Sequence, residues 1–205
     1  MSARFVLHHN PQSRAQRIRW LLEETGAPYE LVHHDFEART HKTREFLALN
    51  PDGKLPTLVD RGPDGSWSTV VTESAAIALH VADAVPDAGL APALGDPARG
   101  LYLNWVVYGV AVIEPSLLDE VFPRADEPPA SAVGWPPFPA ALDRVAAGLV
   151  GRPYLLGDAF SAADLAIGSF LLWVRAWGKL PDPERFADYL DRLAARPAYA
   201  RAQGG

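Results

Sequence analysis

The chain has 205 residues, a formal net charge of -6 and 48% hydrophobic residues. This length suits one large domain or two small ones, and an acidic chain without a basic run is not a general nucleic-acid binder. Because the sequence has no cysteine, disulfides, thiolate metal ligands and cysteine nucleophiles are excluded. Any thiol chemistry therefore has to use a thiol that a ligand brings.

No stretch of the sequence predicts a targeting or membrane segment. Residues 1–9 are too short and too polar for a signal peptide. The longest apolar stretch, near residues 165–174, is too short to span a bilayer. We therefore expect a soluble, cytoplasmic protein without a membrane partner.

The first 84 residues predict the order strand, helix, strand, helix, strand, strand, helix. Apolar residues at helical spacing follow Ser13 and stop at Gly26, and a Gly-Pro-Asp-Gly loop at 62–65 separates two short strands. The predicted strands cover residues 4–8, 29–33, 57–60 and 67–71, and the predicted helices begin at Ser13, Thr43 and Ser74. A strand, a helix and a parallel strand form a crossover unit, so this half predicts an α/β domain that ends in a hairpin and a helix.

The second half predicts helices only. Residues 86–97 contain three prolines and two glycines, which is typical of a linker, and residues 123–139 contain six prolines, which predicts a loop. Apolar stripes predict one long helix through residues 101–112, two further helices at 140–150 and 162–177, and a last amphipathic helix around residues 186–193. We therefore expect a first domain at residues 1–84, a linker at 85–97 and an all-helical domain at 98–205.

Ser13 is the first candidate for chemistry, because it follows the first strand and opens the first helix. In one interpretation Ser13 and Gln16 form a capping box, and the hydroxyl only caps the helix. In the other, the hydroxyl and the N–H groups of the helix end stabilise an anion such as a thiolate. Lowering a thiol pKa of about 8.5 by about two units needs roughly 2.7 kcal/mol, which one such hydrogen bond and the helix end can supply. Asn10 is a second candidate donor, or a loop residue that precedes Pro11.

Two further sites precede the third strand and the third helix. If the Leu55–Pro56 bond is cis, the Leu55 N–H and C=O turn outward and can pair with an extended peptide, whereas a proline at the start of an edge strand is otherwise ordinary. Glu73 and Ser74 either cap the next helix or bind the ammonium and carboxylate of an amino-acid head group.

The paired histidines do not predict a metal site. His8 and His9 are adjacent in a predicted strand, as are His33 and His34 near the end of another, and adjacent strand residues point to opposite faces. The sequence also has no Gly-rich phosphate loop and no Gly-x-Ser-x-Gly motif. We therefore expect no metal.

Four segments, spread over nearly the whole chain, resemble the cytosolic glutathione S-transferase family. Residues 13–24 are similar to the first helix of that family, and residues 50–58 to the segment that leads into its cis-proline. Glu73-Ser74 with Ala76-Ile77 is similar to its γ-glutamyl site, and residues 157–165 to the capping motif of its C-terminal domain. The Ser-Arg-Ala pattern most resembles a serine-type branch of bacteria and fungi. The resemblance implies an α/β fold with a thioredoxin-like N-terminal domain and an all-α C-terminal domain.

The resemblance also implies a role for each candidate residue. Ser13, with Asn10 as the alternative, would donate to the sulfur of glutathione, and the Leu55 backbone beside Pro56 would pair with its cysteinyl unit. Glu73 and Ser74 would hold the γ-glutamyl head group. The groups expected near the glycine carboxylate are Lys54, and less directly His41 or Lys42. Ser161 and Asp164 look like a structural cap.

These roles predict a glutathione transferase, in which the glutathione thiolate attacks a small hydrophobic electrophile. Tyr102, Trp105, Tyr108 and Gly109 on the long helix either line the pocket for that electrophile or belong to the core or a subunit contact. The resemblance implies glutathione as co-substrate and a homodimer. The alternatives are a glutathione-dependent isomerase, a disulfide-bond reductase, and a non-catalytic glutathione-binding or assembly module. The sequence does not identify the electrophile.

Overall fold

The computed structural model describes residues 3–126 and 128–204. The chain divides into two compact units, of which the first comprises Met1–Gly89 with Arg196–Gly205 and the second Leu90–Ala195. The predicted boundaries differ from this division at the C-terminus, because the structure groups the last residues with the first unit. Each unit is described by itself below.

The first unit contains a mixed sheet of four strands in the order β2-β1-β3-β4. The strands are β1 (Phe5–His9), β2 (Tyr29–His33), β3 (Thr57–Asp60) and β4 (Thr69–Thr72). β1 pairs with β2 in parallel and with β3 antiparallel, and β4 is antiparallel to β3. The predicted α/β fold is confirmed, and two predicted strands, β2 and β3, have the observed bounds.

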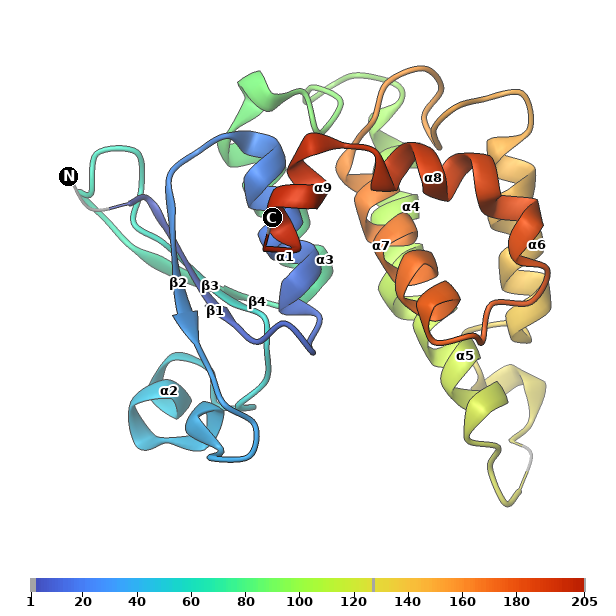
Figure 1. The fold of residues 1–205 in the computed structure, drawn as a ribbon, viewed down its shortest axis with the longest axis horizontal. Helices are drawn as coiled ribbons and strands as arrows, with labels where there is room; N and C mark the ends of the chain where they lie inside the picture. The colour runs from blue at the N-terminus through green and yellow to red at the C-terminus, as the bar shows by residue number, and fades with distance from the viewer. Residues whose placement is uncertain (1–2, 127, 205) are drawn as a thin grey trace. The chain divides into compact units, whose positions relative to one another are not determined.

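Helices of the first unit cover both faces of this sheet. On one face α1 (Ala15–Thr25) packs against α3 (Ser74–Ala84) (Figure 1). Ile18, Leu21 and Leu22 are fully buried, and Gly26 ends α1 in a left-handed conformation at φ 66°, as glycine does at helix ends. On the other face α2 (Arg44–Leu49) packs its Phe46 ring against the rings of two histidines.

The last helix, α9 (Pro197–Ala202), lies beside α1 (Figure 1). Arg196 binds Glu24 with two hydrogen bonds of 2.6 and 2.8 Å. The Tyr199 ring lies edge-on to the Trp20 ring, with centroids 5.0 Å apart. These contacts explain why the C-terminal residues belong to the first unit.

The second unit is helical, as predicted. Its elements are α4 (Arg99–Tyr108), a π-helical segment (Gly109–Ile113), α5 (Glu114–Val121), α6 (Phe138–Leu149), α7 (Ala162–Ala176) and α8 (Ala187–Ala194). The predicted long helix therefore changes its hydrogen-bonding pattern at Gly109–Ile113. Pro115 explains the change, because a proline has no N–H to donate and its ring clashes with the carbonyl four residues earlier.

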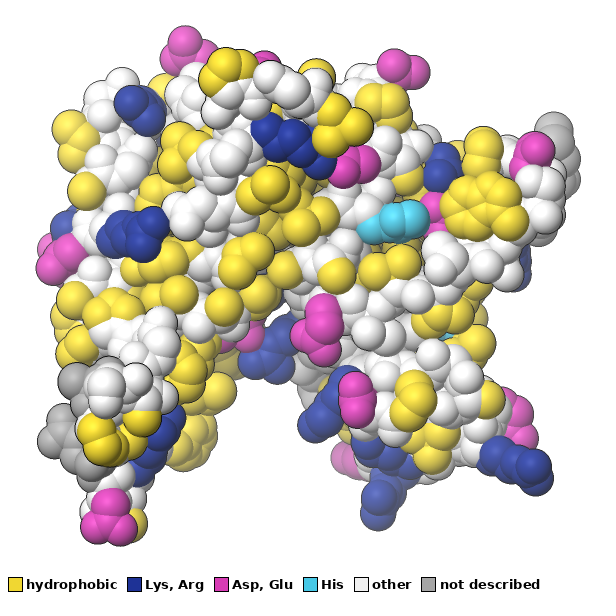
Figure 2. All heavy atoms as spheres, turned by 180° about the vertical axis from the view of Figure 1, so that it is seen from behind, with side chains coloured by type: hydrophobic (Ala, Val, Ile, Leu, Met, Phe, Trp, Pro, Cys, Tyr) yellow, Lys and Arg dark blue, Asp and Glu magenta, His cyan; other side chains and the backbone are white. Residues whose placement is uncertain are grey.

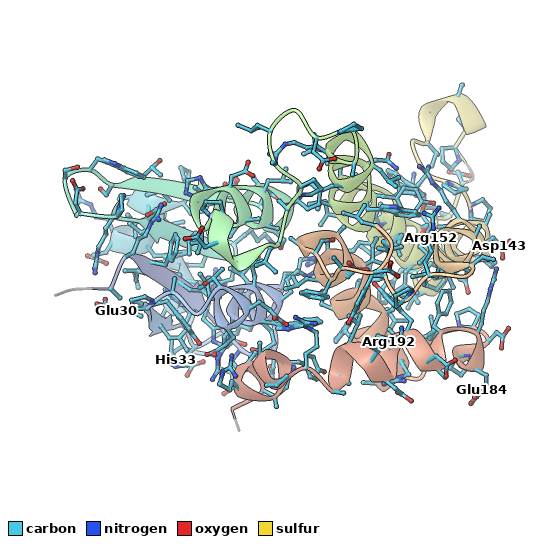
Figure 3. All side chains as sticks on the ribbon, turned by 90° about the horizontal axis from the view of Figure 1, so that it is seen from above. Glu30, His33, Asp143, Arg152, Glu184 and Arg192 are labelled. Carbon is cyan, nitrogen blue, oxygen red and sulfur yellow. The ribbon has the colours of Figure 1, made fainter. Side chains whose placement is uncertain are left out.

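Small residues and arginines join the helices of this unit. A Cβ atom on Gly168 of α7 would lie 2.0 Å from a methyl group of Leu193, so only glycine allows α7 and α8 to approach this closely. Arg192 of α8 donates to the Pro153 carbonyl over 2.9 Å, and Arg185 reaches Asp143 of α6 over 2.6 Å; Asp143 and Arg192 are labelled in Figure 3.

The proline-rich loop is shorter than predicted, because α6 begins at Phe138 with Pro139 in its first turn. A proline is tolerated there since the N–H of a first-turn residue has no partner within the helix. Asp119 ties the two ends of the loop together. Its carboxylate accepts hydrogen bonds of 2.9 and 3.1 Å from Arg124 and one of 2.8 Å from the Trp135 indole. The predicted cap of α7 is confirmed, since Ser161 and Asp164 form a capping box.

Within the described part of the chain, one helical stretch reaches the length and hydropathy of a bilayer span. It is the stretch Arg99–Val121, with 23 residues and a mean hydropathy of 1.4, and it is longer than the apolar stretch noted from the sequence. Half of its most apolar window is buried inside the protein. The core helix of a folded domain has the same properties, so this hydropathy needs no membrane.

Candidate functional site

The loop between β1 and α1 is built around Ser13. The Ser13 Oγ donates to the Asn10 carbonyl over 2.7 Å and accepts from the Ala15 N–H over 3.1 Å. The Ser13 N–H also donates to the Asn10 carbonyl, over 3.0 Å. The Ser13 hydroxyl therefore satisfies the Ala15 N–H of the first turn, but the N-cap position belongs to Arg14. The predicted capping box is wrong, because the Gln16 side chain turns to His9 and to the C-terminal residues Ala202 and Gln203 instead.

The Asn10 amide joins the ends of the two parallel strands. Its Nδ2 donates to the carbonyl of His34, just beyond β2, over 2.7 Å. Its Oδ1 accepts from the Gln12 N–H over 2.8 Å. Both ends of the amide thus have partners within the fold.

The turn before β3 is held by Asn50. This residue is 2% exposed, and its Nδ2 donates to the Lys54 carbonyl and to the Thr57 hydroxyl, both over 3.0 Å. The Leu55–Pro56 bond is cis, Leu55 is half-buried, and Lys54 is exposed.

Lys42 lies against the same turn. Its Nζ donates to the Asp52 carbonyl over 2.9 Å, and a Cβ atom on Gly53 would lie 2.5 Å from that Nζ. The neighbouring His41 ring packs edge-on against Phe36 at 5.0 Å. The His41 Nδ1 is buried and has no hydrogen-bond partner among the residues that the structure describes.

Glu73 precedes α3 in a conformation that non-glycine residues rarely adopt. Its φ and ψ are 67° and 125°, and its side chain makes no capping hydrogen bond. Helix capping therefore does not explain the Glu73 side chain, which is exposed, whereas Ser74 is buried. Strained backbone of this kind costs of order 1–3 kcal/mol and clusters at functional sites.

The strand register brings three of the predicted segments to one edge of the sheet. His8 of β1 is opposite Thr57 of β3, and Thr57 is opposite Thr72 of β4. The end of β1, the start of β3 and the end of β4 therefore meet at the same edge. Ser13, Leu55 and Glu73 follow or precede these three strand ends by one to four residues.

The predicted residues of the second unit lie in its interior. Tyr102, Trp105 and Tyr108 are 0%, 4% and 5% exposed. The Arg144 guanidinium of α6 lies 4.4 Å from the centroid of the Tyr108 ring. Burial raises the pKa of the Tyr108 hydroxyl, although the neighbouring Arg144 acts in the opposite direction. Trp105 and Tyr108 thus contact α6 of the same unit, and the Tyr102 ring lies 5.9 Å from the Arg99 guanidinium of α4.

His8 and His34 bond to each other inside the first unit. The His8 Nδ1 lies 2.9 Å from the His34 Nε2 on the α2 face, and burial, with a smaller contribution from His34, lowers the pKa of His8 to about 4. Over the described residues, no cluster of three or more His, Cys, Asp or Glu side chains could hold a metal ion.

The sheet order and the attached helical unit define a protein with a thioredoxin-like N-terminal domain and an all-helical C-terminal domain. Residues 4–83 match the family model "Glutathione S-transferase, N-terminal domain", and residues 115–192 match "Glutathione S-transferase, C-terminal domain". A crystal structure of a glutathione transferase from Methylococcus capsulatus str. Bath is 31% identical, covers 98% of this chain and 97% of that chain, and has a TM-score of 0.77. The chain belongs to the glutathione S-transferase family.

Two further relatives bear on function. A glutathione transferase from Burkholderia graminis, solved with two glutathione molecules bound per protein subunit, is 28% identical with a TM-score of 0.77, and the match covers 98% of this chain and 87% of that chain. The disulfide-bond oxidoreductase YfcG of Escherichia coli (strain K12) is 27% identical over 96% of this chain and 93% of its own length.

The sequence alone did not single out His9 and Gln16 as site residues. Gln16 is the second residue of α1, and its side chain links the end of β1 to α9. A sequence pattern could not reveal this link, because its partners come from the two ends of the chain.

Proposed function

We propose that this protein is a glutathione transferase that binds glutathione within residues 1–84 and ionises its thiol beside Ser13. The observation that carries the proposal is the meeting of the segments of Ser13, Leu55 and Glu73 at one edge of the sheet. A relative with the same fold was solved with glutathione bound, which supports the choice of ligand.

Ser13 is a better thiol donor than Asn10. Both ends of the Asn10 amide are bonded inside the fold. The Ser13 hydroxyl hydrogen is held by the Asn10 carbonyl, which also accepts the Ser13 N–H. If the hydroxyl rotates toward a sulfur, that carbonyl keeps one partner, so the rotation leaves no buried acceptor unpaired. The new bond to a thiolate is charge-assisted and therefore stronger than the bond it replaces.

The rest of the tripeptide is assigned to the same edge. The Leu55 backbone beside Pro56 pairs with the cysteinyl unit as an added strand does. Glu73 binds the γ-glutamyl ammonium, and Ser74 binds the neighbouring carboxylate. The Glu73 carboxylate suits this role because it is exposed and makes no capping hydrogen bond to α3. Lys42 and Lys54, with His41 next to them, provide the positive charge for the glycine carboxylate.

In the reaction, the bound thiolate attacks an electrophilic carbon of a small hydrophobic second substrate. The protein contributes stabilisation of the anion and orientation of the two reactants. Because Tyr102, Trp105 and Tyr108 are 0%, 4% and 5% exposed, we assign these rings to the core of the second unit and not to a substrate pocket.

A disulfide-bond reductase is the second candidate, because the Escherichia coli relative is a disulfide-bond oxidoreductase. Because this chain has no cysteine, glutathione itself would have to attack the disulfide. The two reactions are separated by their products, which are a thioether for conjugation and a mixed disulfide plus a free thiol for reduction.

We also propose a cytoplasmic homodimer. The outer side of α4 exposes Leu103 and Val107 at 37% and 46%, and hydrophobic side chains are spread over the face seen in Figure 2. Side chains of this kind suit a contact between two copies. Sedimentation of the wild-type chain, compared with an L103K/V107K variant, would test this assignment.

Titration of the bound thiol tests the main proposal. The ultraviolet absorbance of glutathione bound to the wild type should show a thiol pKa well below about 8.5, and Ser13→Ala should lose about 1–3 kcal/mol of that stabilisation. If the bound thiol of the wild type ionises near its solution value, the protein is a binding module and not a transferase.

A further inference from the structure

The first turn of α1 is tied by one side chain to both the end of β1 and the C-terminal helix. The Gln16 Oε1 lies 2.8 Å from the His9 Nε2, and the Gln16 Nε2 donates to the Ala202 carbonyl over 2.6 Å. The Gln16 N–H donates to the Ser13 carbonyl over 3.1 Å. Gln16 is therefore bonded to Ser13 through its main chain and to His9, Ala202 and Gln203 through its side chain.

Gln16 also selects the state of the His9 ring. An amide oxygen only accepts hydrogen bonds, so the His9 Nε2 has to carry the hydrogen. Burial lowers the pKa of His9, and this outweighs the opposite effect of the hydrogen bond to Gln16. The ring is thus neutral, 1% exposed and, among the described residues, bonded through Nε2 alone, because the buried Nδ1 has no hydrogen-bond partner there.

The C-terminal segment holds α1 along its length. Arg196 pairs with Glu24 over 2.6 Å and Arg201 with Glu23 over 2.7 Å, near the end of the helix. Arg19, one turn further toward the start, donates to the Arg201 carbonyl over 3.1 Å. The bonds from Gln16 to Ala202 and Gln203 are the ones nearest to Ser13.

We propose that Gln16 and His9 are positioning residues for thiol ionisation, and that the C-terminal helix acts through Gln16 on the glutathione site. This inference rests on the proposed role of Ser13. A hydroxyl stabilises a thiolate only over a short range of distance and angle, so the placement of the first helical turn sets how much stabilisation Ser13 delivers. Neither His9 nor Gln16 touches the reacting sulfur in this proposal; both act by fixing the turn that carries Ser13.

Gln16→Met is the decisive variant, because methionine keeps the length of the side chain and removes its hydrogen bonds to His9, Ala202 and Gln203. We expect the thiol pKa of bound glutathione to rise by about half to one unit, which, from a wild-type thiol pKa of about 6.5, lowers the thiolate fraction at pH 6.5 by about twofold to fivefold. The Kd for S-methylglutathione, which has no ionisable thiol, should stay within about twofold of the wild type, because the binding groups at Leu55 and Glu73 are untouched.

Two further variants separate positioning from general loss of stability. Thr25→Ala removes a cap at the other end of α1, where the hydroxyl donates to the Leu22 carbonyl over 2.7 Å and accepts from the Ala27 N–H over 3.1 Å. It should lower the melting temperature and leave the thiol pKa unchanged. His9→Phe should raise the thiol pKa as Gln16→Met does, and the double variant should raise it no further, because both residues belong to one network.

Titration of the glutathione thiol bound to the wild type tests the proposed function independently of the role of Gln16. A wild-type thiol that ionises near its solution value would overturn both the role of Ser13 and this inference. The other outcome is a thiol pKa that is lowered equally in the wild type and in Gln16→Met, with only the melting temperature of the variant reduced. That result would support the proposed function and reject the positioning role of Gln16.

Discussion

His8 and His9 are neighbours in β1, yet the two faces of the sheet give them different partners. His9 bonds to Gln16 of α1, and through it to the C-terminal helix. His8 bonds to His34, whose ring contacts Phe46 of α2 and reaches the Thr40 hydroxyl at 3.3 Å. The comparison separates two functions. The α1 side of the sheet carries Ser13 and should control ionisation of the thiol. The α2 side carries His41 and Lys42 and should control the affinity for glutathione.

Among the variants that test this comparison, Phe46→Ala should have the largest effect on stability. Phe46 is 3% exposed and fills the space between α2 and the rings of His8 and His34. Its truncation should cost about 3–5 kcal/mol of unfolding free energy, measured in urea, and weaken glutathione binding without changing the thiol pKa of the bound form. Leu49→Ala, at a position 37% exposed on the same helix, should cost less than about 1 kcal/mol. Equal losses in the two variants would contradict the packing role of Phe46.

Glu73 directly follows β4, at the sheet edge near which Ser13 and Leu55 also lie. Glu73→Gly should weaken glutathione binding by about 1.5–3 kcal/mol, because a charge-assisted bond to the ammonium is lost. The same change should raise the unfolding free energy by about 0.5–1 kcal/mol, since glycine relieves the φ of 67°.

Glu73→Gln provides the matched control, because it keeps the backbone strain and removes the charge. It should weaken binding and leave stability nearly unchanged. Calorimetry that shows full glutathione affinity for both variants would refute the head-group assignment.

His8 predicts how stability depends on pH. In the unfolded chain the His8 pKa is near 6.5, and in the folded protein it is lowered to about 4, so the unfolded state binds the proton more readily. The stabilising contribution is complete above about pH 6.5 and is lost as the pH falls toward 4. Because water screens a partly accessible ring, we expect a loss of about 1–2 kcal/mol.

Urea denaturation between pH 7 and pH 4 measures this effect. His8→Phe should lose less stability than the wild type over the same range. The remaining slope belongs to groups such as His34 and Asp60, whose pKa values are also lowered in the folded protein. Parallel curves for the two proteins would show that His8 does not titrate as described.

The smallest expected effect is that of Lys42→Met. Removing this charge should raise the Kd for glutathione about fivefold, equal to roughly 1 kcal/mol, and added salt should reduce the difference. The thiol pKa should not move. A shift in thiol pKa would show that the α1 and α2 faces are not separate in function.

Much of the fold could be predicted because its signals are local. The apolar spacing after Ser13 and the stop at Gly26 placed α1, and the segments around Leu55 and Glu73 were recognised with their order along the chain. The sequence pattern could not show that the hydroxyl hydrogen of Ser13 is held by the Asn10 carbonyl, nor that Glu73 has an unusual backbone conformation. Both depend on how the loops leave the sheet edge.

The sequence by itself determined the order of strands and helices, the absence of a protein thiol, and the candidate residues for holding a borrowed one. Only the tertiary structure decided the side-chain partners of Gln16, which lie 7, 186 and 187 residues away along the chain. It also decided that α9, which has no apolar stripe to predict it, belongs to the first unit. The reason is physical: propensity and periodicity act over a few residues, whereas a buried amide bonds to whatever partners the folded chain brings within about 3 Å.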